Sequence, residues 1–170
     1  QRFYEGRIVC IKKKSEYRIE PACEHFGLCG GCKWQHLNYA EQLKLKEKQV
    51  KDSLERIAKV KYREFYPIIG SEKQFEYRNK LEFTFTDRRW MTDFDPSKEL
   101  GGPENKNGLG FHLPGLFNRV LDVHHCYLQP EPSNQIRLAV KGFSIENGLS
   151  FYNLQNRTGL LRNLIVRNST

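Results

Sequence analysis

The stretch Ala22-Cys23-Glu24-His25-Phe26-Gly27-Leu28-Cys29-Gly30-Gly31-Cys32-Lys33-Trp34-Gln35-His36 is a glycine-rich loop that carries three cysteines. A fourth, Cys126, follows more than ninety residues downstream. Four thiolates are typical of iron–sulfur clusters and of tetrahedral zinc. The loop would bring three soft ligands to one point, and the fourth would close a four-coordinate site. The pattern therefore predicts a metal centre at Cys23, Cys29, Cys32 and Cys126.

The type of metal is left open by spacing alone. Adjacent glycines let the backbone approach a cluster closely and donate N–H groups to its sulfurs, which favours an iron–sulfur centre. Structural zinc is the main alternative, with His25 or His36 in place of Cys126. Zinc knuckles usually pair two C-x₂-C units, however, and this chain has one. The third alternative is a set of ordinary reduced thiols.

The fifth cysteine, Cys10, lies in the apolar run from Arg7 to Ile11, and we expect it to be a buried structural thiol. An odd cysteine count suits a reducing compartment better than a disulfide scaffold. The sequence contains no apolar run long enough for a transmembrane helix and no signal peptide at its start. We therefore expect a cytoplasmic protein without a membrane partner.

Charge is unevenly distributed along the 170 residues, whose formal net charge is +8. Residues 1–64 hold 15 Lys and Arg against 9 Asp and Glu, whereas residues 65–170 hold 13 against 11. A basic segment favours a polyanionic partner such as RNA. The alternative is a solvated charged surface.

The first half of the chain predicts one strand and one helix. Residues 3–11 alternate as a strand does. Residues 38–60 favour a helix, with Asn38 as its N-cap and Glu41 completing a capping-box-like pair. Four apolar residues would share one face of this helix: Leu43, Val50, Leu54 and Ile57.

The second half changes to the two-residue period of strands. Residues 77–86 would be a half-buried strand with Leu81, Phe83 and Phe85 on its inner face. A mobile loop is expected over 92–107, a hairpin over 108–123, a helix from Ser133 to about Gly142, and strands over 149–156 and 160–167. The prediction is an α+β fold: an antiparallel β-sheet with a few packed helices and a cysteine-rich metal-binding loop.

A family resemblance rests on several motifs. They are Pro21-Ala22-Cys23-x₅-Cys29-Gly30-Gly31-Cys32-x₂-Gln35-His36, Tyr77-Arg78-Asn79-Lys80, Gly110-Phe111-His112-x-Pro114-Gly115, Leu121-Asp122-Val123-x₂-Cys126-x-Leu128-Gln129 and Gly159-Leu160-Leu161-Arg162-x₄-Arg167. Together they cover nearly the whole chain, which resembles the RNA uracil-5-methyltransferases. Those enzymes use S-adenosylmethionine to make 5-methyluridine in ribosomal RNA.

The resemblance implies a 4Fe–4S cluster on Cys23, Cys29, Cys32 and Cys126. It also implies that residues 1–14 are the last strand of a TRAM (OB-like) domain and residues 15–170 the central iron–sulfur RNA-recognition domain. The Rossmann-like domain with the S-adenosylmethionine site and the nucleophile would be absent. We therefore expect the 170 residues to be catalytically inactive by themselves, monomeric, and part of an enzyme for 23S ribosomal RNA.

RNA contacts are expected where basic and aromatic side chains occur together. The candidates are Arg78, Lys80, Phe111, His112, Lys33, Trp34, Arg88 and Arg89. Phe111 could instead be core packing, and Arg78 a salt-bridge partner of Glu76 or Glu82. Two other classes of protein stay open at this point. One is a zinc-stabilised nucleic-acid-binding module with no attached enzyme, and the other is a purely structural interaction domain.

Overall fold

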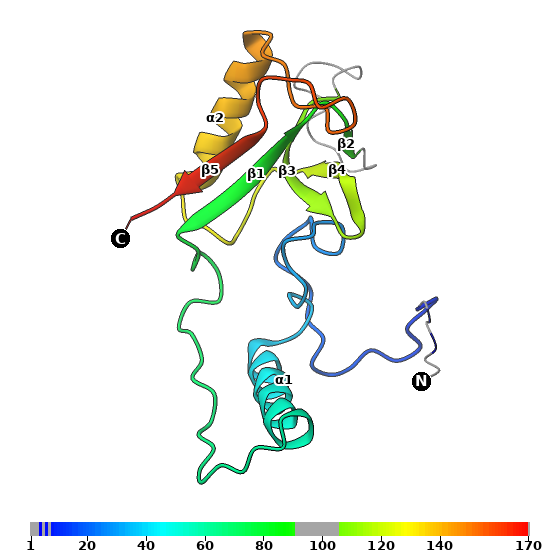
Figure 1. The fold of residues 1–170 in the computed structure, drawn as a ribbon, viewed down its shortest axis with the longest axis vertical. Helices are drawn as coiled ribbons and strands as arrows, with labels where there is room; N and C mark the ends of the chain where they lie inside the picture. The colour runs from blue at the N-terminus through cyan, green and yellow to red at the C-terminus, as the bar shows by residue number, and fades with distance from the viewer. Residues whose placement is uncertain (1–3, 5, 7, 91–105, 170) are drawn as a thin grey trace. The chain divides into compact units, whose positions relative to one another are not determined.

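The computed structural model describes residues 4, 6, 8–90 and 106–169. They fall into two compact units (Figure 1). The helical unit is Gln1–Pro21 with Trp34–Gly70, and the sheet unit is Ala22–Lys33 with Ser71–Thr170. The loop expected over 92–107 lies almost entirely outside the described residues. None of the described helices is long and apolar enough to span a membrane.

The helical unit is built on α1 (Tyr39–Asp52), which continues into a π-helical turn, η1 (Ser53–Ile57). The predicted N-cap is confirmed, because the Asn38 side chain accepts a hydrogen bond from the Glu41 N–H at 2.9 Å. The reciprocal half of the capping box is not formed. The Asn38 N–H donates to the Tyr17 carbonyl instead, at 3.0 Å.

The apolar stripe of α1 and η1 is at most half-buried, contrary to the expectation from its periodicity: Leu43 and Leu54 are half-buried. No residue of α1 is buried, and Val50 and Ile57 are 52% and 80% exposed. Near the first turn of α1, Leu43 lies against Gly70. The apolar spacing therefore predicted the helix correctly but not its burial.

The N-terminal expectation is corrected in two respects. The described residues among 3–11 form no strand, and Cys10 is exposed rather than buried. No described strand pairs with this segment, and an isolated strand is not stable in water. A thiol on it consequently has no core to enter.

The sheet unit contains five described strands in the order β2-β4-β3-β1-β5 (Figure 1). Their bounds are β1 Lys80–Thr86, β2 Arg89–Trp90, β3 Gly108–Leu113, β4 Leu116–Asp122 and β5 Asn163–Arg167. The β1, β3, β4 and β5 pairings are antiparallel, as predicted, but β2 runs parallel to β4. The α+β class is confirmed, with a mixed sheet rather than a purely antiparallel one.

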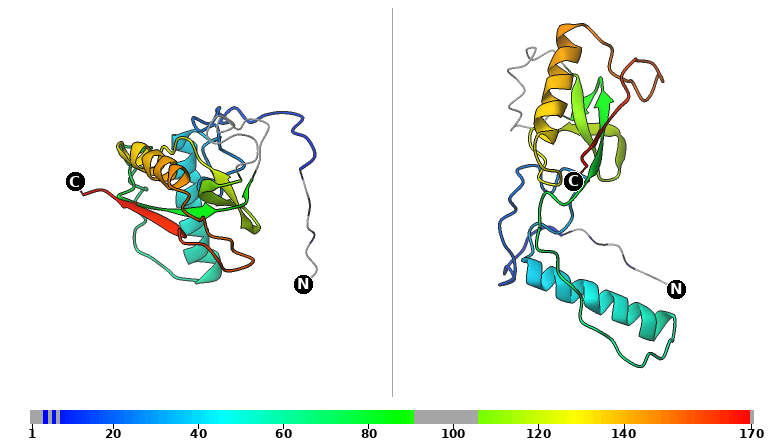
Figure 2. Two further views of the ribbon diagram at one scale, coloured as in Figure 1. Left: turned by 90° about the horizontal axis from the view of Figure 1, so that it is seen from above. Right: turned by 90° about the vertical axis from the view of Figure 1, so that its left-hand side faces the viewer.

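One face of the sheet carries the core. Leu81, Phe83 and Phe85 of β1 are buried as predicted, together with Leu109 and Val166 on the neighbouring strands. The helix α2 (Ser133–Glu146) covers this face (Figure 2). The opposite face of the sheet is not covered by α2.

The connections near both ends of this sheet differ in part from the sequence expectations. The predicted hairpin is confirmed, with Gly115 at a φ of 75° in its turn. Residues 149–156 form only isolated bridges to Thr158 and Leu161 rather than a continuous strand. The last strand is shorter than predicted, because β5 begins at Asn163.

The helix α2 buries mainly polar residues and exposes several apolar ones, although Val140 and Ile145 are half-buried against the core. It begins at Ser133, whose hydroxyl donates to Gln129 rather than capping the helix, and it continues past Gly142. Its buried residues are Ser133, Asn134, Arg137, Lys141 and Ser144, whereas its exposed apolar residues are Ile136, Leu138 and Phe143. This reversal brings charged groups into the sheet unit next to β4 and the segment that follows it.

Candidate metal centre and its polar scaffold

The cysteine loop, Ala22–Lys33, belongs to the sheet unit and is held against β3. The Gly30 N–H donates to the His112 carbonyl at 3.2 Å. A Cβ atom at Gly30 would lie 2.5 Å from that oxygen, so only glycine permits the contact. The loop also closes on itself, since the Cys29 N–H donates to the His25 carbonyl at 2.8 Å.

A Gly30→Ala substitution should loosen this attachment. The added methyl group has to displace the backbone of β3 or of the loop, and overpacking of this kind costs about 1–3 kcal/mol. Gly142→Ala is the matched control, because a Cβ there meets nothing within 4 Å and alanine is the better helix former. Urea unfolding compares the two variants. Equal unfolding midpoints for Gly30→Ala and the unaltered chain would contradict the close approach.

Cys126 lies just beyond β4 and is fixed by α2. Its N–H donates to Asn134 Oδ1 at 2.8 Å, and Asn134 Nδ2 donates back to the Cys126 carbonyl at 3.2 Å. Cys126 is buried in the core of the sheet unit, and Cys32 packs against that core. Cys23 and Cys29 are half-buried. Cys126 therefore lies in the same region of the sheet unit as Cys32 of the loop.

The four thiols influence one another electrostatically. Burial raises the pKa of Cys29 to about 11, opposed by the Gly31 N–H that donates to its sulfur at 3.3 Å. The charges of Cys126, Cys23 and Cys32 raise this pKa further. Burial also raises the pKa of Cys23 and of Cys126, and Cys32 adds to both shifts. Burial and mutual repulsion therefore disfavour the thiolate forms of these cysteines, and a bound cation would favour them.

The four sulfurs do not meet at one point. Among the described residues, no three His, Cys, Asp or Glu side chains converge closely enough to ligate a single ion. The two histidines considered as replacements for Cys126 lie in different units. His25 Nε2 accepts the His124 N–H at 3.0 Å, and burial lowers the pKa of His25. His36 belongs to the helical unit.

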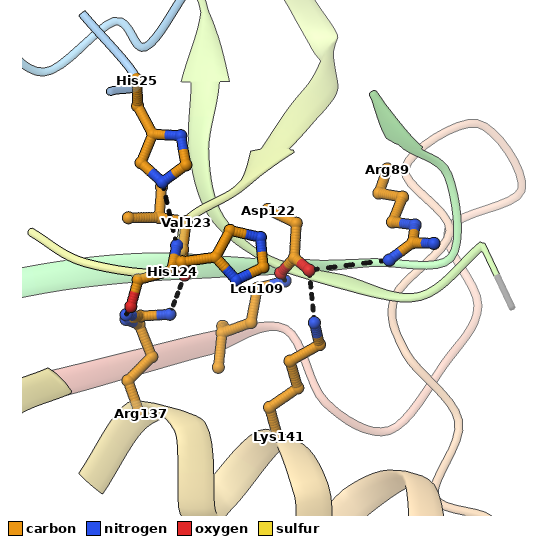
Figure 3. Close-up of polar contacts among 8 residues, drawn as sticks. All are labelled: His25, Arg89, Leu109, Asp122, Val123, His124, Arg137 and Lys141. Carbon is orange, nitrogen blue, oxygen red and sulfur yellow. Dashed lines mark hydrogen bonds and ion pairs between the residues drawn. The ribbon is translucent and has the colours of Figure 1, made fainter. Parts of the chain in front are cut away.

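A buried arginine supports the segment that leads to Cys126 (Figure 3). Arg137 is fully buried and donates to the carbonyls of Val123 and His124, the latter at 2.7 Å. Its guanidinium also contacts Asn134 Oδ1 at 3.2 Å and lies 5.3 Å from the centre of the Phe83 ring. Burial lowers the pKa of this arginine, and these acceptors compensate its two desolvated terminal nitrogens, whereas the buried Nε has no hydrogen-bond partner among the described residues.

A second buried charge cluster anchors β4 from both sides (Figure 3). Asp122 accepts the Leu109 N–H at 2.9 Å, forms an ion pair with Lys141, and lies 3.7 Å from the Arg89 guanidinium. This geometry corrects the sequence expectation for Arg89. Its side chain is buried against Asp122, so it does not face RNA in this structure.

The other candidate RNA contacts occupy different environments. Arg78, Lys80 and His112 are exposed. In the part of the chain that is described, Arg78 forms no ion pair with Glu76 or Glu82. His112 Nε2 lies 3.3 Å from Thr84 Oγ1.

The remaining candidates are engaged with protein neighbours to different degrees. Phe111 is half-buried against Phe83 at 5.0 Å between ring centres, as the core-packing alternative has it. Arg88 is exposed and donates to Gln155 at 2.7 Å. Lys33 is exposed at the end of the cysteine loop. Trp34 lies in the helical unit, where the Lys46 ammonium is 5.9 Å from its ring.

Sequence reasoning missed the polar scaffold of the site. Its members on α2 are Asn134, Arg137 and Lys141, spaced by three and four residues. The same helical period that marks an apolar face was present in polar residues. Because polar residues are mostly exposed, that period was not interpreted as a buried face.

Comparison with known proteins relates the chain to RNA-modifying enzymes. No family model matches it. It is 46% identical over 169 residues to an uncharacterized RNA methyltransferase of Bacteroides thetaiotaomicron, which covers 99% of this chain and 37% of that protein. A protein of the same description from Porphyromonas gingivalis is 45% identical over 173 residues, again 99% of this chain and 37% of the relative. The chain is homologous to part of these RNA methyltransferases. It spans little more than a third of their length.

A solved structure is similar over almost the same extent. The Pyrococcus abyssi tRNA (uracil-54, C5)-methyltransferase, in complex with S-adenosyl-L-homocysteine, matches 93% of this chain and 30% of its own with a TM-score of 0.60. The two sequences are 26% identical. The fold of this RNA methyltransferase homologue is therefore found within a uracil-C5 methyltransferase.

Proposed function

We propose that this chain is the RNA-recognising, 4Fe–4S-carrying region of an S-adenosylmethionine-dependent RNA (uracil-5-)-methyltransferase. The observation that carries the proposal is the match of 93% of the chain to part of a uracil-C5 methyltransferase structure. In the longer enzyme, S-adenosylmethionine would supply the methyl group. The residues described here would hold the cluster and bind RNA.

The donor set supports a cluster more than a single zinc ion. Zn–S bonds of about 2.3 Å would bring the four sulfurs to within about 3.8 Å of one another. In a 4Fe–4S cluster each thiolate binds a different iron, so the sulfurs stay farther apart. The charges of Cys23, Cys32 and Cys126 raise the pKa of Cys29, so the four thiols share one region in which a group larger than a single ion could bind. The Gly31 N–H on the Cys29 sulfur is a contact that stabilises a cluster-bound thiolate.

Exposed cations on the sheet unit support RNA binding. Lys80 and Arg167 lie directly opposite each other on β1 and β5, and both are exposed. Like charges directly opposite each other destabilise a sheet by roughly 0.2–1 kcal/mol. An RNA phosphate would offset this repulsion. Arg78 lies two residues before Lys80 and is also exposed.

An Arg78→Ala variant should bind single-stranded RNA more weakly. Its guanidinium is exposed and forms no ion pair with its acidic neighbours in the described chain, so it is available to a phosphate. Loss of one phosphate contact should reduce the slope of log affinity against log salt by about one. Fluorescence anisotropy with a labelled oligoribonucleotide measures this slope. A salt range of about 50–200 mM is suitable.

Arg56→Ala is the matched control, because the Arg56 guanidinium is exposed but already paired with Asp52 at 3.3 Å. It removes the same formal charge from the chain. If both variants change the salt slope equally, the effect reflects net charge, and Arg78 is not a specific contact.

The RNA substrate of the longer enzyme is a separate part of the proposal. The motif resemblance favours 23S ribosomal RNA, whereas the name of the structural neighbour favours transfer RNA as the second candidate. Mass spectrometry of each RNA, after incubation of a protein of the relatives' length with S-adenosylmethionine, distinguishes them by the position of 5-methyluridine. The 170 residues alone are expected to produce none, and methylation by them would contradict the proposal that they only bind RNA.

A further inference from the structure

We infer that a cleft on the open face of the sheet binds one unstacked base of single-stranded RNA. This inference rests on the proposed RNA-binding function and specifies where a base is held. The cleft has a volume of about 350 Å³. Residues that line it include Thr84, His112, Phe117, Asn118, Tyr152 and Arg162.

The cleft is on the side of the sheet that α2 does not cover. Thr84 of β1 pairs in register with Asn163 of β5, and both line the cleft, so they share one face. Their neighbours Phe83 and Leu164 point to the core side. A volume of this size lies at the small end of ligand pockets, which span roughly 300–1,000 Å³. It suits a single nucleotide rather than a duplex.

Two aromatic side chains provide stacking surfaces. Phe117 is 74% exposed, although it lies on a strand next to a buried core. Tyr152 is half-buried, and the Arg162 guanidinium lies 4.9 Å from the centre of its ring. Bases in single-stranded RNA stack on aromatic rings and on guanidinium planes. An exposed phenylalanine beside an arginine–tyrosine stack supplies both kinds of surface.

Polar groups around the cleft match the edges of a base. Asn163 is oriented by a 2.6 Å hydrogen bond from its Nδ2 to Glu82, and Asn118 lies on the opposite side on β4. Carboxamides both donate and accept, as the Watson–Crick edge of every base does. His112 adds a ring nitrogen 3.3 Å from Thr84 Oγ1. The cleft is therefore polar at its edges and aromatic on its walls.

A pair of cations lies farther along the same face, beyond Glu82 of β1 and Ile165 of β5. Thr84 and Lys80 are four residues apart on β1, a distance of about 13 Å. Arg167 is opposite Lys80, and Asn163 is opposite Thr84. A chain that places one base in the cleft can therefore direct its neighbouring phosphates toward Lys80 and Arg167. This arrangement favours an RNA strand over a free nucleotide.

The test compares Phe117→Ala with Phe143→Ala in RNA binding. Both phenylalanines are mostly exposed, 74% and 61%, but Phe143 lies on α2, which covers the opposite face of the sheet. Anisotropy with a single-stranded oligoribonucleotide should give an affinity about 5- to 150-fold weaker for Phe117→Ala, the effect of losing one stacked base. The slope against salt should stay unchanged. Phe143→Ala should bind as the unaltered chain does.

A second variant, Tyr152→Leu, keeps an apolar wall but removes the aromatic ring, and it should also weaken binding. Equal affinities for Phe117→Ala, Tyr152→Leu and Phe143→Ala would overturn the inference while leaving RNA binding intact. A reduced salt slope in Phe117→Ala would also overturn it, since the loss would then be electrostatic. If the unaltered chain binds no RNA at low salt, the proposed function itself fails. Thermal unfolding of all variants checks that each one is folded.

Discussion

A Cys126→Ser variant, purified without oxygen, is expected to contain no intact cluster. The unaltered chain should hold about four irons and four acid-labile sulfides and absorb broadly near 400 nm, roughly the behaviour of a 4Fe–4S centre. Cys126 would supply the ligand that comes from the core rather than from the loop. Serine is nearly isosteric and keeps the Asn134 contacts, which involve only the backbone of residue 126. The expected loss is therefore one of ligation rather than of folding.

Cys10→Ser is the control for this experiment, because Cys10 is exposed and lies outside the sheet unit. It should retain the full iron and sulfide content. About one zinc per chain, with no iron, would contradict the cluster. The alternative of a zinc-stabilised nucleic-acid-binding module would then return. Iron content unaffected by Cys126→Ser would show that another residue completes the site.

An Arg137→Met variant should be destabilised by about 3 kcal/mol. Methionine preserves much of the side-chain volume but leaves the carbonyls of Val123 and His124 without their buried donor. Each buried acceptor that loses its partner costs roughly 1–3 kcal/mol. The free energy of unfolding from urea titration, monitored by circular dichroism, measures the change. The same variant should hold less iron, since these carbonyls fix the approach to Cys126.

The matched control is Arg56→Met, which removes an exposed arginine that pairs with Asp52 on the surface of the helix. Pairs of this kind contribute about 0–1 kcal/mol. If both methionine variants unfold at the same urea concentration, Arg137 does not act as a buried support. Restored stability in Arg137→Lys would indicate that one charge, rather than the forked geometry of the guanidinium, is sufficient.

Local patterns predicted the parts of the fold that local physics determines. The alternation in β1 gave the inner face correctly, and the hairpin around Gly115 was predicted from its turn residues. Asn38 was predicted as a cap from its residue type, and its side chain accepts the Glu41 N–H in the first turn. Pairing between strands that are distant in the sequence was harder to predict. The parallel pairing of the two-residue strand Arg89–Trp90 leaves no periodic signal in the sequence.

Amphipathicity was misleading where burial depends on a specific partner. The apolar stripe of α1 predicted a packed face that the described residues do not bury, whereas α2 buries Arg137 and Lys141 and exposes Phe143. Burial of a charge is favourable only when its acceptors are in place. Those acceptors, Asp122 and the carbonyls before Cys126, come from another part of the chain.

Cysteine spacing predicts the four thiols as metal ligands, which stays a prediction, whereas the polar residues that support them were not predicted. The adjacent glycines indicated a close backbone approach, which Gly30 makes to β3. Arg89 was misassigned because an arginine beside a tryptophan resembles an RNA contact. Its partner Asp122 lies on a strand whose pairing with β2 could not be inferred.

The sheet unit is assembled from two separate stretches of chain, since residues 34–70 leave it and return. Cys32 and Cys126 are separated by more than ninety residues. Bringing the ends of so long a segment together costs about 4 kcal/mol of chain entropy, apart from a constant contribution. A cluster bound to both ends would act as a cross-link that restricts the unfolded chain. We therefore expect the folding of this unit to be slow without the cluster. The chain entropy of closing the long loop is lost before the contacts between its two ends can form.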